Sequence, residues 1–334
     1  MKRARRLVRY CERLDGAGFG APKVALLPFG ACEPARVLSG DPLRPRTLRE
    51  TGETVDLHRH PWFARESSAG ASENREGRLL DWELSCDDHA IRILPPVAEP
   101  PVFLGTGLNY HRHAEECGLP PPAVPILAFC KPSTAMQRPG GRIAVPACCD
   151  PDVPEVDWEV ELAVVIGEHR DTGALCKDAT LENALDYVLG YTVANDVSAR
   201  LWQTDPERTG GQWNRGKSFD TFAPLGPALV LQESGFDPHA DLEVTMRVNG
   251  ETMQRSHTGD MIHDVPAIVE FMSRDTTLLP GTVLLTGTPE GIGMFQDPPR
   301  YLRDGDVCAA EIEGIGTLVN PVVDAAASAT TASR

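Results

Sequence analysis

The chain has 334 residues, enough for one large domain or for two domains of unequal size. Its 48 acidic residues outnumber its 32 basic residues, and the net charge of -16 argues against a nucleic-acid partner. No stretch approaches the roughly 20 apolar residues of a membrane span, and the nine cysteines form neither a zinc pattern nor a disulfide framework. We therefore expect a cytoplasmic protein that binds neither nucleic acid nor membranes.

Residues 1–95 contain short apolar runs, such as 24–27, between clusters of turn-forming residues, and they predict a small N-terminal domain rich in strands. Basic residues open this segment and faintly resemble a transit peptide, but Glu12 and Asp15 interrupt them. A polar patch at 67–77 predicts a surface loop. The proline-rich segment 95–101 cannot continue a helix or a central strand, so it predicts a domain boundary.

The pattern changes from residue 96, and residues 96–323 predict a larger domain dominated by strands. Strands are expected at 160–166, 191–194, 228–231, 242–248, 283–286 and 307–312, and helices at 181–189 and 265–272. Residues 324–334 are small and polar without periodicity and predict a disordered tail. The expected fold class is α+β, rich in β-structure.

Two acidic residues alternate with apolar ones in the segment 157–167. Because side chains of a strand repeat every two residues, Glu159 and Glu161 share one face, about 7 Å apart at their Cα atoms, and can converge on a hard cation. A solvated acidic face on an edge strand is the alternative. The run 164–166 is apolar on both faces, however, and indicates a buried strand, where unpaired carboxylates are costly.

A third acid, Asp196, follows the predicted strand 191–194, which a helix ending at Gly190 would precede. Taken alone, Asp196 fits the N-cap of a helix over 197–202 better than a metal ligand. Together with Glu159 and Glu161, and with waters, it would complete the octahedral oxygen shell of Mg²⁺ or Mn²⁺.

Five motifs occur in order along the chain. They are GLNY at 107–110 followed by His113 and Glu116, DWEVEL at 157–162, NDVSAR at 195–200, GKSFD at 216–220 and TGTP at 286–289. Over roughly residues 93–321 the chain thereby resembles the fumarylacetoacetate hydrolase (FAH) superfamily. The resemblance implies an FAH-type mixed β-roll catalytic domain, usually dimeric, so we expect a homodimer. It also implies a metal held by Glu159, Glu161 and Asp196, and cleavage or isomerisation of acylpyruvate-like substrates.

Four polar residues in or near these motifs make chemical sense beside such a metal. Lys217 would place a compact ammonium near the substrate carboxylate or a developing enolate. Arg200 and Gln203 are three residues apart, so on a helical turn both can donate to substrate oxygens. Thr288 lies in a glycine-rich loop whose hydroxyl and N–H groups could hold the substrate carboxylate.

His113 and Glu116 are also three residues apart and would share one helix face. This pair can orient and deprotonate a water molecule, because the carboxylate stabilises the imidazolium as it forms. His111 with His113, and His58 with His60, also match the HxH pattern of zinc ligands, but no third soft ligand stands at a suitable spacing.

Two positions depart from the family pattern. The usual Arg-Asp step is here Arg200-Leu201, and the usual Pro-Gly-Asp ends in Thr282. Neither change removes a proposed ligand, but the lost acid beside Arg200 bears on how that guanidinium is oriented.

The resulting hypothesis is a metal-dependent hydrolase that cleaves a C–C bond of an acylpyruvate-type (2,4-dioxo acid) substrate through a metal-stabilised enolate. The complete pair of His113 and Glu116 favours hydrolysis, because it is the water-activating part. The alternative is an oxaloacetate tautomerase or decarboxylase, or a related 2-oxo acid isomerase or hydratase, at the same metal site. A zinc hydrolase and a non-catalytic relative are the remaining alternatives, although a scaffold has no need to bury like charges.

Overall fold

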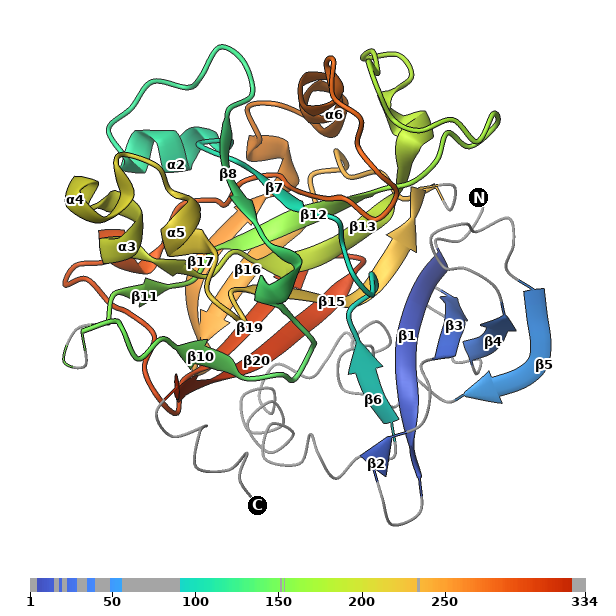
Figure 1. Cartoon of the computed structure of the whole chain (residues 1–334), viewed down its shortest axis with the longest axis horizontal. Helices are drawn as coiled ribbons and strands as arrows, with labels where there is room; N and C mark the ends of the chain where they lie inside the picture. Colours follow the sequence, from blue (N-terminus) through green and yellow to red (C-terminus); the bar gives the residue numbers. More distant parts are fainter. Residues whose placement is uncertain are drawn as a thin grey trace.

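The computed structural model describes residues 5–14, 18–19, 23–28, 35–39, 49–55, 91–150, 152, 154–232 and 235–325. Two β-sheets form its centre, and short helices lie around them (Figure 1). The expected loop at 67–77, His58 and His60, and nearly all of the expected disordered tail lie outside the described residues.

The larger sheet contains thirteen of the described strands. Its main path runs β5 (Arg49–Val55), β4 (Ala35–Ser39), β3 (Lys23–Pro28), β1 (Arg5–Leu14), β15 (Ala223–Leu231), β13 (Val188–Asn195), β12 (Val160–Ile166), β18 (Val283–Leu285), β7 (Phe103–Thr106) and β8 (Leu127–Lys131). β2 (Gly18–Phe19) and β6 (Ile91–Leu94) pair with β1, and β9 (Met136–Gln137) pairs with β15. The N-terminal strands thus continue the sheet of the larger predicted domain, because β1 pairs antiparallel with β15.

The smaller sheet has five described strands, in the order β10 (Ile143–Val145), β20 (Gly316–Asp324), β19 (Val307–Ile312), β16 (Glu243–Val248) and β17 (Glu251–His257). A short pair joins β11 (Val156–Asp157) to β14 (Ser198–Ala199). The helices are α2 (His111–Glu116), α3 (Arg200–Thr204), α4 (Pro206–Thr209), α5 (Asn214–Lys217) and α6 (Val265–Ser273), with 3-10 turns at η3 (Ser133–Ala135), η4 (Ala184–Tyr187), η6 (Thr258–Asp260) and η7 (Gly293–Phe295). This is the sheet-rich α+β architecture expected from the sequence.

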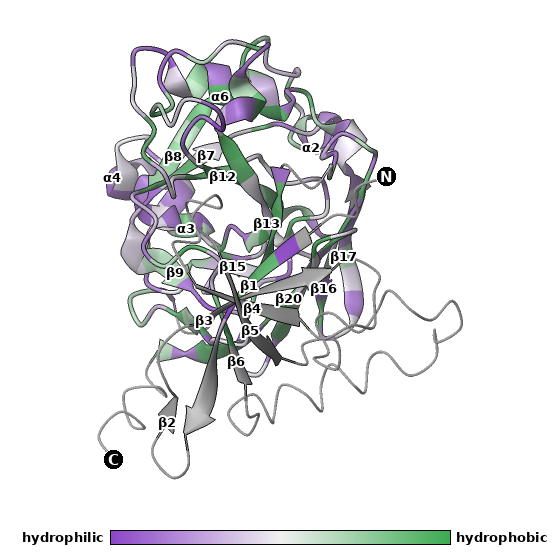
Figure 2. Ribbon diagram, turned by 90° about the vertical axis from the view of Figure 1, so that its right-hand side faces the viewer, coloured by the Kyte–Doolittle hydropathy of each residue, from purple (hydrophilic) through white to green (hydrophobic). Residues whose placement is uncertain are grey.

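Strand β12 lies in the middle of the larger sheet and is buried along its whole length. Leu162 and Val164 pack into an apolar cluster together with side chains of the smaller sheet, while Ala163 and Val165 belong to a second cluster. Figure 2 shows the same pattern, with hydrophobic residues along β12 and β13 and hydrophilic ones on the outer helix α4. The two apolar faces predicted for residues 164–166 are therefore confirmed, and both cores hold the strand in place.

Helix α6 matches the predicted helix over 265–272. Asp264 caps it by accepting a hydrogen bond from the N–H of Ala267. The predicted helix over 181–189 is wrong, because the chain forms only the turn η4 there and then enters β13 at Val188. Gly190 therefore lies inside a strand, where a Cβ atom would come within 2.3 Å of the carbonyl oxygen of Val230. Close strand packing, rather than a helix end, explains this glycine.

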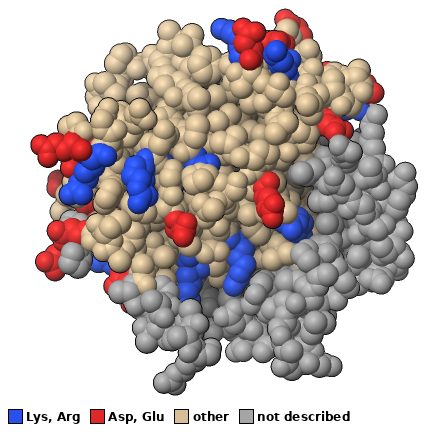
Figure 3. Space-filling view, viewed as in Figure 1, with Lys and Arg blue, Asp and Glu red and all other residues tan. Residues whose placement is uncertain are grey.

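No helix of the described residues is long and apolar enough to cross a membrane. On the face shown in Figure 3, the described acidic and basic side chains occur in small mixed groups rather than as one field of a single sign.

Candidate metal and active site

Three carboxylates predicted as metal ligands meet where β12 and β13 pair. Glu159 immediately precedes β12, Glu161 lies within it, and Asp196 follows β13. The antiparallel register places Glu161 opposite Ala194, and the N–H of Asp196 donates to the carbonyl oxygen of Glu159. One oxygen atom from each acid lies within 4.8 Å of the others, and all three side chains are buried. Asp196 caps no helix, because α3 begins only at Arg200.

The electrostatics of this acidic cluster suit a bound cation. Glu161 accepts a hydrogen bond from the N–H of Gly287 at 2.7 Å, but within the described residues it forms no ion pair. Burial raises the pKa of Glu161 well above its usual range, and the charges of Asp196 and Glu159 raise it further. Such a carboxylate is costly unless a cation neutralises it. A hard divalent ion with oxygen ligands suits this donor set.

Lys217 stands directly beside the acidic cluster. Its Nζ atom lies 2.8 Å from Oε2 of Glu159 and also contacts Oδ2 of Asp196. Burial lowers its pKa, but these two carboxylates outweigh that effect and raise the pKa above its usual value, so the side chain is a cation. Gly216 allows α5 to pack closely against α3, because a Cβ atom at this position would come within 2.6 Å of the backbone nitrogen of Gln203. This close packing places the ammonium of Lys217 beside the acidic cluster.

A second buried lysine, Lys131 at the end of β8, was not anticipated from the sequence. Its ammonium lies 2.5 Å from Oδ1 of Asp196 and donates to the carbonyl oxygens of Val197 and Phe222. Three oxygen atoms thus surround the ammonium. Lys131 therefore fixes the orientation of Asp196, whereas Lys217 faces the cavity described below. No sequence motif marked Lys131; only its place at the end of a strand, before Pro132, sets it apart.

Arg200, predicted to bind substrate, is held mainly by protein carboxylates. Its Nε and Nη2 atoms lie 2.8 Å from Oδ2 of Asp157, and Nη1 lies 2.6 Å from Oε1 of Glu159 and 2.9 Å from Oε1 of Gln203. Asp157 also accepts hydrogen bonds from the N–H groups of Gly293 and Met294. Arg200 thus orients Glu159 and Gln203, and no sequence pattern indicated that Asp157 would anchor it.

His113 and Glu116 form the expected pair on α2, with Nδ1 and Oε2 2.9 Å apart. The other oxygen of Glu116 accepts a hydrogen bond from the N–H of Gly291, which ties the pair to the loop before η7. Although burial lowers the pKa of His113, its contacts with Cys117 and Glu116 raise it to about 9. The imidazole is therefore mostly protonated at neutral pH.

The hydroxyl of Thr288 is used within the protein, because it donates to the carbonyl oxygen of Val160 and accepts from Nε2 of Gln254. The backbone of this loop, and not the Thr288 hydroxyl, is therefore available to bind a ligand. Next to it, Gly287 adopts φ +94°, and a Cβ atom there would lie 2.8 Å from Cβ of Asn109. A glycine is required at this turn, which is the one that presents an N–H to Glu161.

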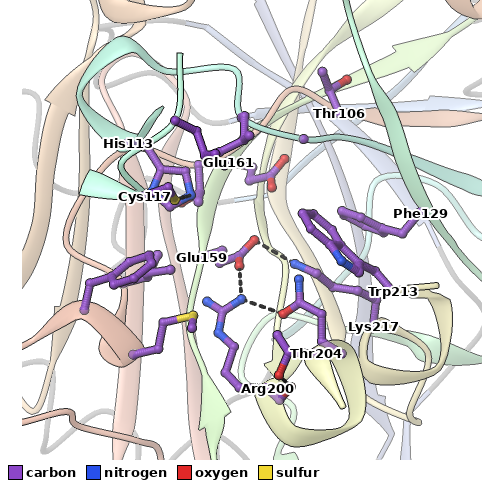
Figure 4. Close-up of a pocket in the computed structure, with 18 residues that line it drawn as sticks. Thr106, His113, Cys117, Phe129, Glu159, Glu161, Arg200, Thr204, Trp213 and Lys217 are labelled. Atoms are coloured by element: carbon purple, nitrogen blue, oxygen red, sulfur yellow. Dashed lines mark hydrogen bonds and ion pairs between the residues drawn. The ribbon is translucent and has the colours of Figure 1, made fainter. Parts of the chain in front are cut away.

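One cavity of about 290 Å³ brings the predicted site residues together. Its lining includes His113, Glu159, Glu161, Arg200, Gln203, Lys217 and Thr288. Figure 4 shows Glu159, Arg200 and Lys217 close together, with His113 and Cys117 on one side and Phe129 and Trp213 on the other. Asp196 and Glu116 lie behind this surface, in contact with Lys217 and His113 respectively.

The zinc alternative finds no support at 111–113. Within the described part of the chain, the one group of three potential ligands is the acidic cluster, and it contains neither His111 nor His113.

Comparison with known proteins agrees with this geometry. The family model described as "Fumarylacetoacetate (FAA) hydrolase C-terminal" matches residues 103–323. A Bos taurus protein named oxaloacetate tautomerase FAHD2A, mitochondrial, is 45% identical over 233 residues, which cover 70% of this chain and 70% of that protein. The crystal structure of 2-hydroxyhepta-2,4-diene-1,7-dioate isomerase from Mycobacterium marinum has a TM-score of 0.67 at 36% identity and covers 96% of this chain and 98% of its own.

A second structure, 5-carboxymethyl-2-hydroxymuconate delta-isomerase from Mycobacterium smegmatis, has a TM-score of 0.67 at 34% identity and covers 96% of this chain and 99% of its own. The matched region contains the acidic cluster, both buried lysines and the pair on α2. The chain therefore belongs to the fumarylacetoacetate hydrolase family.

Proposed function

We propose that the protein is a divalent-metal tautomerase of small 2-oxo acids, with oxaloacetate as a substrate. The observation that carries this proposal is the buried acidic cluster, in which Glu161 has no ion pair among the described residues while Lys217 stands beside it. A relative named oxaloacetate tautomerase supports the same substrate. Of the two reactions expected from the sequence, the comparisons thus favour the tautomerase alternative over C–C hydrolysis.

In this reaction the C3–H bond of the ketone breaks, a C2–C3 double bond forms and O2 gains a proton, so that the atoms of the substrate are conserved. Bound Mg²⁺ or Mn²⁺, held by Glu159, Glu161 and Asp196, would supply Lewis-acid polarisation of the 2-oxo carbonyl. Lys217 donates to O2, where negative charge develops, and supplies its proton. The amide nitrogen of Gln203 binds the substrate carboxylate, together with the backbone at Thr288.

The neutral form of His113 takes the proton from C3, and Glu116 stabilises the imidazolium that results. Lys217 and His113 then return to their starting states by exchanging one proton through solvent. Because the pKa of His113 is about 9, the neutral fraction is small at pH 7. Ketone-to-enol conversion should therefore become faster as the pH rises toward 9.

Hydrolysis stays the second candidate because the complete pair of His113 and Glu116 could also deprotonate water. A non-catalytic relative is less consistent with the site. A scaffold gains nothing from burying the carboxylates of Glu159, Glu161 and Asp196 around one point. Homodimer formation, cytoplasmic location and the absence of nucleic-acid and membrane partners remain predictions from the sequence.

A substrate panel separates the two reactions. The protein is assayed with oxaloacetate and with acylpyruvates in the presence of Mg²⁺ or Mn²⁺, following enol absorbance and pyruvate release separately. We expect fast interconversion of the keto and enol forms of oxaloacetate and no pyruvate above the background without enzyme. Rapid release of pyruvate from an acylpyruvate, with no catalysis on oxaloacetate, would support the hydrolase instead.

A further inference from the structure

The lining of the cavity is of two kinds. Charged and polar side chains surround the acidic cluster, whereas apolar side chains, among them Leu119, Phe129, Trp213 and Phe295, form much of the remaining wall. A volume of about 290 Å³ approaches the lower end of the range that holds drug-sized ligands, roughly 300–1,000 Å³. A four-carbon acid such as oxaloacetate is much smaller than such ligands and leaves space against the apolar side chains.

Local structure holds these apolar side chains in place. Helix α2 ends where Gly118 adopts φ +67° and the N–H of Leu119 bonds to the carbonyl oxygen of Ala114. This turn directs Leu119 to the mouth of the cavity, where it is 49% exposed. Phe129 and Trp213 lie next to each other, and the ring of Phe129 lies beside Lys217 (Figure 4). Phe129 can occupy this place because residue 105 is a glycine. A Cβ atom at position 105 would lie 2.0 Å from the ring.

Each cation that lines the described cavity already pairs with at least one protein carboxylate. Lys217 is paired with Glu159 and Asp196, Arg200 with Asp157 and Glu159, and His113 with Glu116. A nearby arginine, Arg112, lies outside the lining and contacts Glu290. A second carboxylate on the substrate, placed against the apolar side chains, would therefore lose water and compete with protein carboxylates for a cation.

We propose that the site accepts 2-oxo acids with an apolar aryl or branched alkyl group on C3, and that it prefers them to 2-oxo acids with a second carboxylate. The inference rests on the proposed tautomerase function and adds a substrate class to it. The step is the same: the C3–H bond breaks, the proton passes to His113, the C2–C3 double bond forms and O2 takes a proton from Lys217. The apolar group on C3 lies against Leu119, Phe129 and Trp213 and is removed from water.

Phenylpyruvate is the probe, because it has the 2-oxo acid core of oxaloacetate with a phenyl ring in place of the second carboxylate. Differences of one small apolar group in a fitted pocket change kcat/KM by about 10-fold to 200-fold. We therefore expect wild-type kcat/KM for phenylpyruvate tautomerisation to exceed that for oxaloacetate by at least about tenfold.

A matched pair of variants tests the role of the apolar lining. Leu119→Arg introduces a cation at the cavity, and Leu181→Arg makes the same change at a leucine outside the lining that is 53% exposed. We expect Leu119→Arg to reverse or abolish the preference for phenylpyruvate, and Leu181→Arg to leave both substrates at wild-type rates. An unchanged thermal unfolding temperature shows that each variant is folded.

The outcomes are distinguishable. Turnover of oxaloacetate without turnover of phenylpyruvate would overturn this inference and leave the tautomerase proposal standing. Failure of both substrates, with Mg²⁺ and with Mn²⁺, would overturn the tautomerase proposal and this inference with it. Equal effects of Leu119→Arg on both substrates would show that the apolar wall does not discriminate between them.

Discussion

Glu161→Gln is expected to abolish both metal binding and tautomerase activity while leaving the protein folded. Loss of residues that merely support a metal ligand costs about 10-fold to 100-fold in affinity, so removal of a ligand carboxylate should weaken Mg²⁺ and Mn²⁺ binding at least about 100-fold. Isothermal titration calorimetry measures this directly. The absence of a cationic partner for Glu161 among the described residues makes it the most informative of the three acids.

When no metal is present, the same variant should be at least as stable as the wild type. Burial and the charges of Asp196 and Glu159 disfavour the ionised form of Glu161, so a neutral Gln relieves that repulsion. We expect metal-free Glu161→Gln to unfold at a temperature equal to or above that of the wild type. Added Mg²⁺ should raise the unfolding temperature of the wild type only.

Glu182→Gln is the matched control, because Glu182 is an exposed acid outside the cavity lining. It should retain metal binding and activity. Unchanged Mg²⁺ and Mn²⁺ affinity in Glu161→Gln would mean that the acidic cluster is not the metal site.

The second large effect is expected for Glu116→Gln, which preserves the size of the side chain and an oxygen to accept the N–H of Gly291. It removes the charge that stabilises protonated His113. The pKa of His113, about 9 with Glu116 in place, should therefore fall. The rising limb of the pH–rate profile for C3 proton exchange should move to lower pH, and any acylpyruvate cleavage should fall by about 10² to 10⁴.

Glu115→Gln serves as the control on the same helix, because Glu115 is exposed and adjacent in sequence. Its pH profile should match that of the wild type. If Glu116→Gln leaves the limb at its wild-type position, then His113 is not the group that takes the proton from C3.

The pair Glu159 and Glu161 could be predicted from the sequence because its signal is local: alternation places both on one strand face. Asp196 taken alone fits a helix N-cap better, and the family motifs join it to the pair. In the structure, the strand that ends before Asp196 pairs with theirs. The same local reasoning failed at 181–189, where an apolar run with helical spacing belongs partly to the buried strand β13. Periodicity alone separates a short buried strand from a helix poorly.

The residues that hold the site together depend on contacts between distant segments and could not be predicted in this way. Lys131 reaches Asp196 across 65 positions of sequence, and Asp157 reaches Arg200 across 43. Asp157 also accounts for the departure at Leu201, because it supplies the acid that orients Arg200 in three dimensions. Thr282 lies in the turn before β18, outside the cavity lining. Its carbonyl oxygen accepts a hydrogen bond from the N–H of Ile166 at the end of β12.

The central claim is that this acidic cluster binds a hard cation on which enolisation depends. Its most direct test is exchange of the C3 protons of oxaloacetate in deuterated solvent, followed by NMR, with protein stripped of metal by a chelator and then resupplied with Mg²⁺ or Mn²⁺. The stripped protein should exchange protons no faster than solutions without enzyme, and resupplied metal should restore enzyme-dependent exchange to the wild type and not to Glu161→Gln. Full enzyme-dependent exchange by the stripped protein would contradict the account.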